Sequence, residues 1–256
     1  MLQAHSFLWH YLWVAPNVVL LILALLLLRR GSYRKYPFFF AFAAVGAAGQ
    51  LTVYAADVLP SVTAWVWWRI LWTDLVAEGL LKFALIGEIF GQVFDPYPAL
   101  TKLGKFLIRG VGSSLVLAAA LAAAYAPRNS PYGIVLGAHL LEQTIFLIEA
   151  GLLLFIFLFA AYFRLAATRP VFGIALGLGV SACVHLGTWA ILANGWLPDD
   201  RRSLLDMLNM ATYHVAVLIW AYCLLVPQRV ATKSVFPLPE NTLTVWNREL
   251  ERLLQQ

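Results

Sequence analysis

Long apolar stretches fill this 256-residue chain and leave only short polar connections between them. A helix needs about 20 largely apolar residues to cross a bilayer, because each residue adds about 1.5 Å of length. By this rule the chain has seven candidate spans, at residues 6–28, 37–59, 62–93, 106–126, 133–163, 170–194 and 203–226. We therefore predict an all-α integral membrane protein with seven transmembrane helices and no room for a separate soluble domain.

The composition supports this fold class. Hydrophobic residues make up 62% of the chain and charged residues only 12%, about half the charged fraction of an ordinary globular domain. The formal charge of +5 does not indicate nucleic-acid binding, because the basic residues are scattered among short connections. They follow the positive-inside pattern of a membrane protein instead.

The basic residues also predict the orientation. They gather on one side of the predicted membrane, at Arg29, Arg30, Arg34, Lys35, Lys102, Lys105, Arg109, Arg164, Arg169, Arg229, Lys233, Arg248 and Arg252. The other side has only Arg128, Arg201 and Arg202. The N-terminus is therefore expected outside and the C-terminus in the cytoplasm, in what we expect to be a bacterial inner (plasma) membrane. Tryptophans crowd the outer half, at Trp9, Trp13, Trp65, Trp67, Trp68, Trp72, Trp189 and Trp196, where amphipathic rings prefer the interface.

The chain divides into a transmembrane bundle, residues 1–226, and a cytoplasmic tail, residues 227–256. Within the tail, apolar residues recur at helical spacing, at Leu243, Trp246, Leu250, Leu253 and Leu254. This pattern predicts a short amphipathic helix. The helix is expected to lie on the inner surface of the lipid bilayer, or to dock a cytoplasmic or membrane protein partner through residues 241–254.

Ionisable side chains inside the spans are the strongest indication of a functional site. Five carboxylates and one lysine lie there, at Asp74, Glu78, Lys82, Glu88, Glu142 and Glu149. Each costs on the order of 2.5–3.5 kcal/mol in hydrocarbon, so each needs a partner or a purpose. Glu78 and Lys82 are four residues apart and can pair on one helix. This pairing leaves Asp74 without a cation, whereas Glu88 is close enough to the cytoplasmic end to reach water.

Several spans carry polar residues at a similar depth, from the bilayer centre outward. The predicted polar core comprises Asn17, Gln50, Asp74, Glu78, Lys82, Glu142, Gln143, Glu149, His185, Asn209, Tyr213 and His214. Separate helices cannot all direct such groups into lipid, so we expect them to converge on one internal cavity.

A divalent metal is one hypothesis for that cavity. His139 and Glu142 are one helical turn apart, a spacing that can chelate a metal. His185 and His214 would complete the ligand set. The same spacing also serves an interhelical hydrogen-bond clamp, so both interpretations stay open.

In topology alone the chain resembles rhodopsin-like and receptor-like proteins. A retinal protein needs a lysine in its last helix for the Schiff base, and span 203–226 has none. Ser181-x-x-x-His185 resembles one element of the seven-helix membrane hydrolases that hold zinc. The paired histidines of their last helix are missing, because His214 stands alone, and their usual orientation is opposite. We assign no family on these matches.

The sequence favours a non-enzymatic receptor-like or sensor protein, whose outward-biased polar cavity binds a small ligand or ion and which acts through a partner. Three alternatives stay open. They are an intramembrane metal-dependent hydrolase, a proton-coupled carrier that uses the buried carboxylates as a relay, and a structural subunit of a larger membrane complex.

Overall fold

A computed structural model describes residues 6–95, 131–162, 168–194 and 202–226, together with Tyr97, Lys102, Gly104, Phe106, Gly110, Ser113, Ser114, Leu117, Val245 and Arg252. Side chains of α6 are described from Glu142 onward. These residues form helices and contain no strand, as the sequence predicts. Apart from isolated positions, the expected fourth span at 106–126 and the expected tail helix at 241–254 lie outside the described residues.

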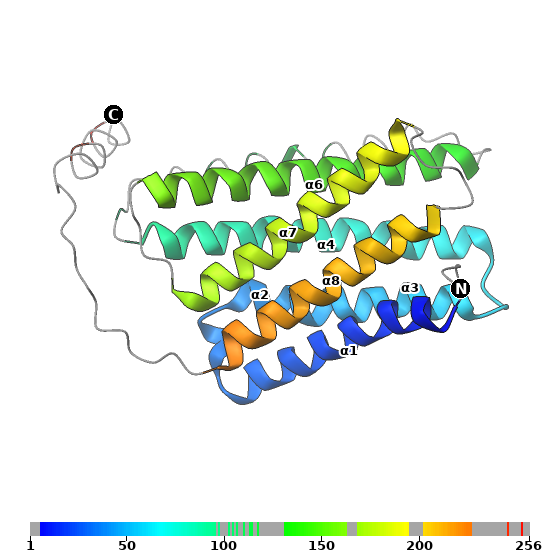
Figure 1. Cartoon of the computed structure of the whole chain (residues 1–256), viewed down its shortest axis with the longest axis horizontal. Coiled ribbons are helices and arrows are strands. Elements are labelled where there is room, and N and C mark those ends of the chain that lie inside the picture. Colours follow the sequence, from blue (N-terminus) through cyan, green and yellow to red (C-terminus); the bar gives the residue numbers. More distant parts are fainter. Residues whose placement is uncertain are drawn as a thin grey trace.

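Six long helices make up the described bundle (Figure 1). They are α1 (Phe7–Arg29), a continuous helix made of α2 (Pro37–Ala41), η2 (Phe42–Gly46) and α3 (Ala47–Val58), then α4 (Ala64–Val93), α6 (Pro131–Tyr162), α7 (Arg169–Ala193) and α8 (Arg202–Leu225). Five of them are long and apolar enough to cross a membrane, which indicates a membrane protein. The exception is α4, which is 30 residues long but carries the charged residues Arg69, Asp74, Glu78, Lys82 and Glu88.

Local sequence signals explain where these helices begin and end. The Ser6 hydroxyl accepts a hydrogen bond from the backbone N–H of Trp9 and caps α1. Gly31 follows that helix with a φ of 68°, a left-handed conformation that glycine adopts without strain. The short helix η1 (Ser32–Arg34) comes next, and Pro37 opens α2. Pro60 holds Leu59 in an extended conformation and so ends α3.

Glu88 has a structural role that the sequence does not predict. Its Oε2 accepts hydrogen bonds from the backbone N–H groups of Phe38 and Phe39, both at 3.1 Å. These donors belong to the first turn of α2, where no intrahelical acceptor is available. The carboxylate therefore caps α2 rather than simply reaching water.

The middle of the second helix is a π-helical turn, η2, with α-helix on either side. Such turns are rare and hold one more residue than an α-helical turn. Phe42 on this turn packs its ring against Trp220 of α8, with ring centroids 5.7 Å apart. The turn therefore lies against the core of the bundle.

Contacts between helices fix their directions. Tyr213 of α8 bonds to Asn17 of α1, and further along both helices Arg30 bonds to Leu225, so α1 and α8 run the same way. Lys82 pairs with Glu149, and the later Phe94 packs on Phe159, so α4 and α6 also run the same way. The starts of α1, α4, α6 and α8 therefore lie together at one end, here called the N-terminal end (Figure 1).

An apolar layer closes the other half of the bundle, here called the far half. It is built from buried side chains of all six helices, including Leu20, Leu23, Leu27, Phe39, Phe42, Ile86, Ile89, Phe90, Ile156, Ile174, Leu178 and Trp220. Trp220 is fully buried in this layer, and its indole Nε1 donates to the carbonyl oxygen of Ile174 at 3.2 Å. This layer is called the apolar seal below.

The close approach of α7 and α8 depends on small residues. A Cβ at Gly177 would overlap the indole of Trp220, whereas a Cβ at Gly187 of the same helix would meet open space. We expect Gly177→Ala to cost about 1–3 kcal/mol, because the Trp220 ring has to move. Gly187→Ala should gain up to about 1 kcal/mol from higher helix propensity. Thermal unfolding of both variants in detergent tests this, and equal melting temperatures would contradict the packing.

Candidate functional site

A buried ion-pair cluster joins α4 and α6. The Lys82 ammonium lies 3.0 Å from Oε1 of Glu78 and 3.5 Å from Oε2 of Glu149. Its side chain is 8% exposed and that of Glu149 only 1%. A charge with so little contact with water is stable only beside an opposite charge. The Lys82 nitrogen also lies 4.3 Å from the ring centroid of Phe146, within cation–π range.

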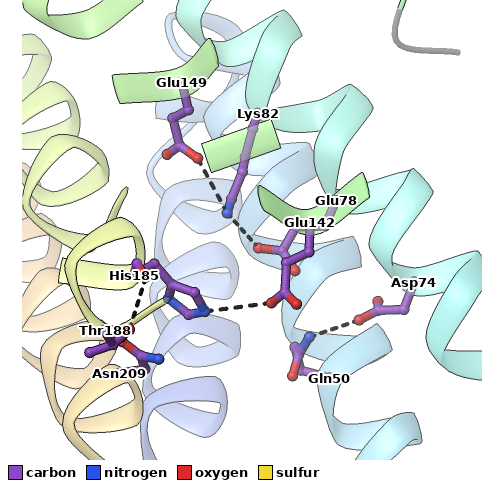
Figure 2. Close-up of polar contacts among 9 residues, drawn as sticks. All are labelled: Gln50, Asp74, Glu78, Lys82, Glu142, Glu149, His185, Thr188 and Asn209. Atoms are coloured by element: carbon purple, nitrogen blue, oxygen red, sulfur yellow. Dashed lines mark hydrogen bonds and ion pairs between the residues drawn. The ribbon is translucent and has the colours of Figure 1, made fainter. Parts of the chain in front are cut away.

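A second polar pair joins α6 and α7. Nε2 of His185 lies 3.5 Å from Oε1 of Glu142. The imidazole also stacks on Phe146, with ring centroids 4.0 Å apart and an interplanar angle of 21°. Phe146 therefore contacts both the lysine of the first cluster and the histidine of this pair. Figure 2 shows Lys82, Glu142 and His185 extending toward one another from α4, α6 and α7.

Asp74 of α4 pairs with an amide rather than a cation. The Nε2 group of Gln50 on α3 donates to Oδ2 of Asp74 at 2.8 Å. The same carboxylate lies against Gly49, where any Cβ would clash with it. Asp74 is buried, and among the described residues no cation lies within ion-pair distance of it. Its negative charge would therefore have no local counterion among those residues.

Neutral polar groups of α1, α7 and α8 complete the arrangement. The Thr188 hydroxyl donates to the carbonyl oxygen of His185 at 2.9 Å and lies 3.0 Å from the amide oxygen of Asn209. The Tyr213 hydroxyl donates to Oδ1 of Asn17 at 3.5 Å. Asn17 in turn donates to the carbonyl oxygen of Trp13 at 2.7 Å.

Two adjoining cavities lie among these residues. The larger has a volume of about 390 Å³ and is lined by Trp9, Leu12, Trp13, Asn17, Gln50, Glu78, Lys82, Glu142, Phe146, Ser181, His185, Asp206, Asn209, Met210 and Tyr213. The smaller, about 180 Å³, is lined by Gln50, Trp67, Trp68, Leu71, Asp74, Leu75, Glu78, Gly79, Lys82, Glu142, Ile145 and Phe146. Together they occupy the N-terminal half of the bundle, on the opposite side of the bundle centre from the apolar seal.

Nine of the twelve residues of the predicted polar core line these cavities. The other three do not. Glu149 is buried as an ion-pair partner of Lys82 and does not line either cavity. Gln143 lines neither cavity. His214 lies against Tyr11, with ring centroids 5.9 Å apart, and its Nδ1 is buried without a hydrogen-bond partner among the described residues.

The predicted metal ligands do not assemble among the described side chains. No group of three histidine, cysteine, aspartate or glutamate side chains in that part of the chain could hold a metal ion. Glu142 and His185 are neighbours, but His214 lies elsewhere. The side chain of His139 lies outside the described residues.

Several cavity residues escape the sequence prediction. Phe146 is the most important, because it contacts Lys82 and His185. It follows Glu142 by four residues and precedes Glu149 by three, so a helical-face pattern could have identified it. Trp13 likewise precedes Asn17 by one helical turn, and it lines the cavity rather than only the membrane interface.

Comparisons with known proteins do not identify a family. No family model, curated protein or solved structure matches this chain. Its function must therefore be argued from the chemistry of the cavity.

The ion-pair cluster gives a stability prediction. We expect Lys82→Met to destabilise the protein by roughly 3–5 kcal/mol, because Glu149 would keep a buried charge without its cation. Adding Glu149→Gln should recover much of this loss, since the amide carries no charge. A double-mutant cycle tests this pairing. It compares the melting temperatures in detergent of the wild type, Lys82→Met, Glu149→Gln and the double variant. An unchanged melting temperature for Lys82→Met would contradict the proposed pairing.

Proposed function

We propose that this chain is a seven-span membrane protein that binds or senses a small ligand or ion in the cavity at its N-terminal end. The observation that carries the proposal is the asymmetry of the bundle. Polar side chains of six helices line a cavity in one half, and the apolar seal fills the other half.

The helix directions support seven spans. Because α1 and α8 run the same way, the chain crosses the bundle an odd number of times between them. The described helices between them account for four of these crossings, an even number. Because α4 and α6 run the same way, the chain must return across the bundle between them. The apolar stretch 106–126 lies in that interval and is long enough for the return.

The positive-inside pattern supports the orientation. Arg29, Arg30, Arg34, Lys35 and Arg169 all lie at the end of the bundle beyond the apolar seal. If that end faces the cytoplasm of a bacterial cell, the cavity opens toward the outside of its plasma membrane. The cytoplasmic tail is then available to a partner.

A binding or sensing role fits this asymmetry better than transport. A carrier must expose its site to both sides in turn, which requires a polar route through the far half. Glu88 is the charged group of α4 in that half, and it caps α2. For a sensor, it is enough that the ligand binds one arrangement of the helices better than another.

Cysteine accessibility tests the proposal. In a background with Cys183 and Cys223 changed to alanine, Ser181→Cys places a thiol in the cavity and Ala175→Cys places one in the apolar seal on the same helix. A membrane-impermeant methanethiosulfonate should modify the cavity thiol from the outside at least roughly tenfold faster than from the inside, because the reaction needs a water-exposed thiolate. The seal thiol should stay unmodified from both sides.

The other outcomes are each decisive. Modification of the cavity thiol from both sides would favour the carrier over the sensor. Modification from the cytoplasmic side alone would reverse the orientation. Protection of both thiols on both sides would mean that no open cavity exists, and the proposed function would fail.

A further inference from the structure

We propose that the end of the bundle beyond the apolar seal binds the headgroup of an anionic phospholipid, held by Arg30 and Arg169. This site is separate from the cavity and does not depend on the proposed function. It follows from where the two guanidinium groups lie, which of their N–H groups are unused, and what the neighbouring surface of α8 exposes.

Two arginines from different helices contact the last turn of α8. Arg30 follows the last residue of α1, and its Nη1 donates to the carbonyl oxygen of Leu225 at 3.4 Å. Arg169 is the first residue of α7, and its guanidinium carbon lies 4.2 Å from the ring centroid of Tyr222. In Figure 1 the end of α8 lies between the end of α1 and the start of α7. The fold therefore brings both cations to one helical turn.

Neither guanidinium group is neutralised by the described residues. No carboxylate in the described ranges lies within ion-pair distance of Arg30 or Arg169. A guanidinium carries several N–H donors, and the single bond from Arg30 to Leu225 leaves most of them available. The Tyr222 ring covers one face of Arg169 and leaves the N–H groups along the edge of the guanidinium. Arginine binds phosphate oxygens through those edge groups, often two at a time.

The charge around this turn favours an anion. Arg29, Arg34 and Lys35 add positive charge at the same end of the bundle. Glu88 and Asp95 are the carboxylates of the described residues at this end, and Glu88 is already engaged in capping α2. Such an excess of positive charge attracts anionic headgroups, and each basic side chain near an anionic membrane surface strengthens the attraction.

The neighbouring surface of α8 favours a lipid over a free anion. Val215, Leu218 and Tyr222 recur three and four residues apart, and they are 50%, 50% and 60% exposed. They therefore form an apolar stripe that leads toward Arg169. Because α8 has 24 residues and about 20 suffice to cross the hydrocarbon, its last turn lies near the level of the headgroups. A phospholipid can place an acyl chain along the stripe and its phosphate beside the arginines.

Matched lipids test the proposal on the purified full-length protein in a neutral detergent. The probes are dioleoyl phosphatidylglycerol, zwitterionic dioleoyl phosphatidylcholine, and glycerol phosphate, which supplies the phosphate without acyl chains. We expect phosphatidylglycerol to raise the melting temperature in a saturable way, and added sodium chloride to weaken this effect by screening. Phosphatidylcholine and glycerol phosphate at equal concentration should raise the melting temperature much less.

Variants locate the site. Arg169→Gln should raise the apparent Kd of phosphatidylglycerol roughly fivefold, as expected for one basic side chain near an anionic headgroup, and adding Arg30→Gln should raise it further. Arg69→Gln is the matched control, because Arg69 also lies over an aromatic ring, 4.9 Å from the Trp65 centroid, but at the N-terminal end of the bundle. It should leave the Kd unchanged. The melting temperature of each lipid-free variant shows whether the variant folds.

The other outcomes would each overturn the proposal. Equal stabilisation by phosphatidylcholine would mean that acyl chains alone account for the binding. Equal stabilisation by glycerol phosphate would mean that the site takes a free anion rather than a lipid. An unchanged Kd in a folded Arg169→Gln variant, or an equal loss of affinity in Arg69→Gln, would mean that the headgroup is not held at this end. None of these results depends on whether the Ser181→Cys thiol is accessible in the cavity.

Discussion

The position of one ammonium group in a low-dielectric interior organises the site. Lys82 satisfies Glu78 on its own helix and Glu149 on a neighbouring one, and it also contacts Phe146 between them. Neither Lys82 nor Glu149 could stay charged at this burial alone. The cluster therefore links the register of α4 to that of α6, and this register brings Glu142 alongside Glu78 at the cavity.

The two halves of the bundle are built on different principles. In the far half, aromatic and aliphatic side chains pack around Trp220 and fill the interior. Glycines on α7 allow α8 to pack closely against it there. In the N-terminal half, the helices carry pairs of polar groups that bond to each other across the interfaces and leave space between them. This division keeps Asp74, Glu78 and Lys82 of α4 inside the bundle without filling the interior.

Much of the fold follows from the sequence, and the site follows in part. The predicted spans 6–28 and 62–93 differ by one or two residues from α1 and α4, because proline, glycine and capping residues mark the helix ends. Counting residues from the helix ends places Gln50 and Asp74 at the same depth in the bundle, where they form a hydrogen bond.

Depth in the bundle does not show, however, toward which neighbouring helix a side chain points. His214 follows Tyr213 by one residue, about 100° around the helix, and so it faces Tyr11 instead of the cavity. The interhelical pairing of Lys82 with Glu149 likewise depends on how the helices are rotated, which the sequence does not reveal.

The π-helical turn η2 decides which changes of length the second helix can accept. Phe42 on this turn faces Trp220, and Gly49 and Gln50 after it face Asp74. Because the turn already holds one extra residue, deleting one residue there would restore an ordinary α-helical turn and leave the two ends nearly in register. Inserting a further residue would instead rotate the Gln50 end against the Phe42 end by about 100°, and either the aromatic contact or the amide–carboxylate contact would then be lost. An insertion between Phe42 and Gln50 should therefore be tolerated less well than a deletion within η2.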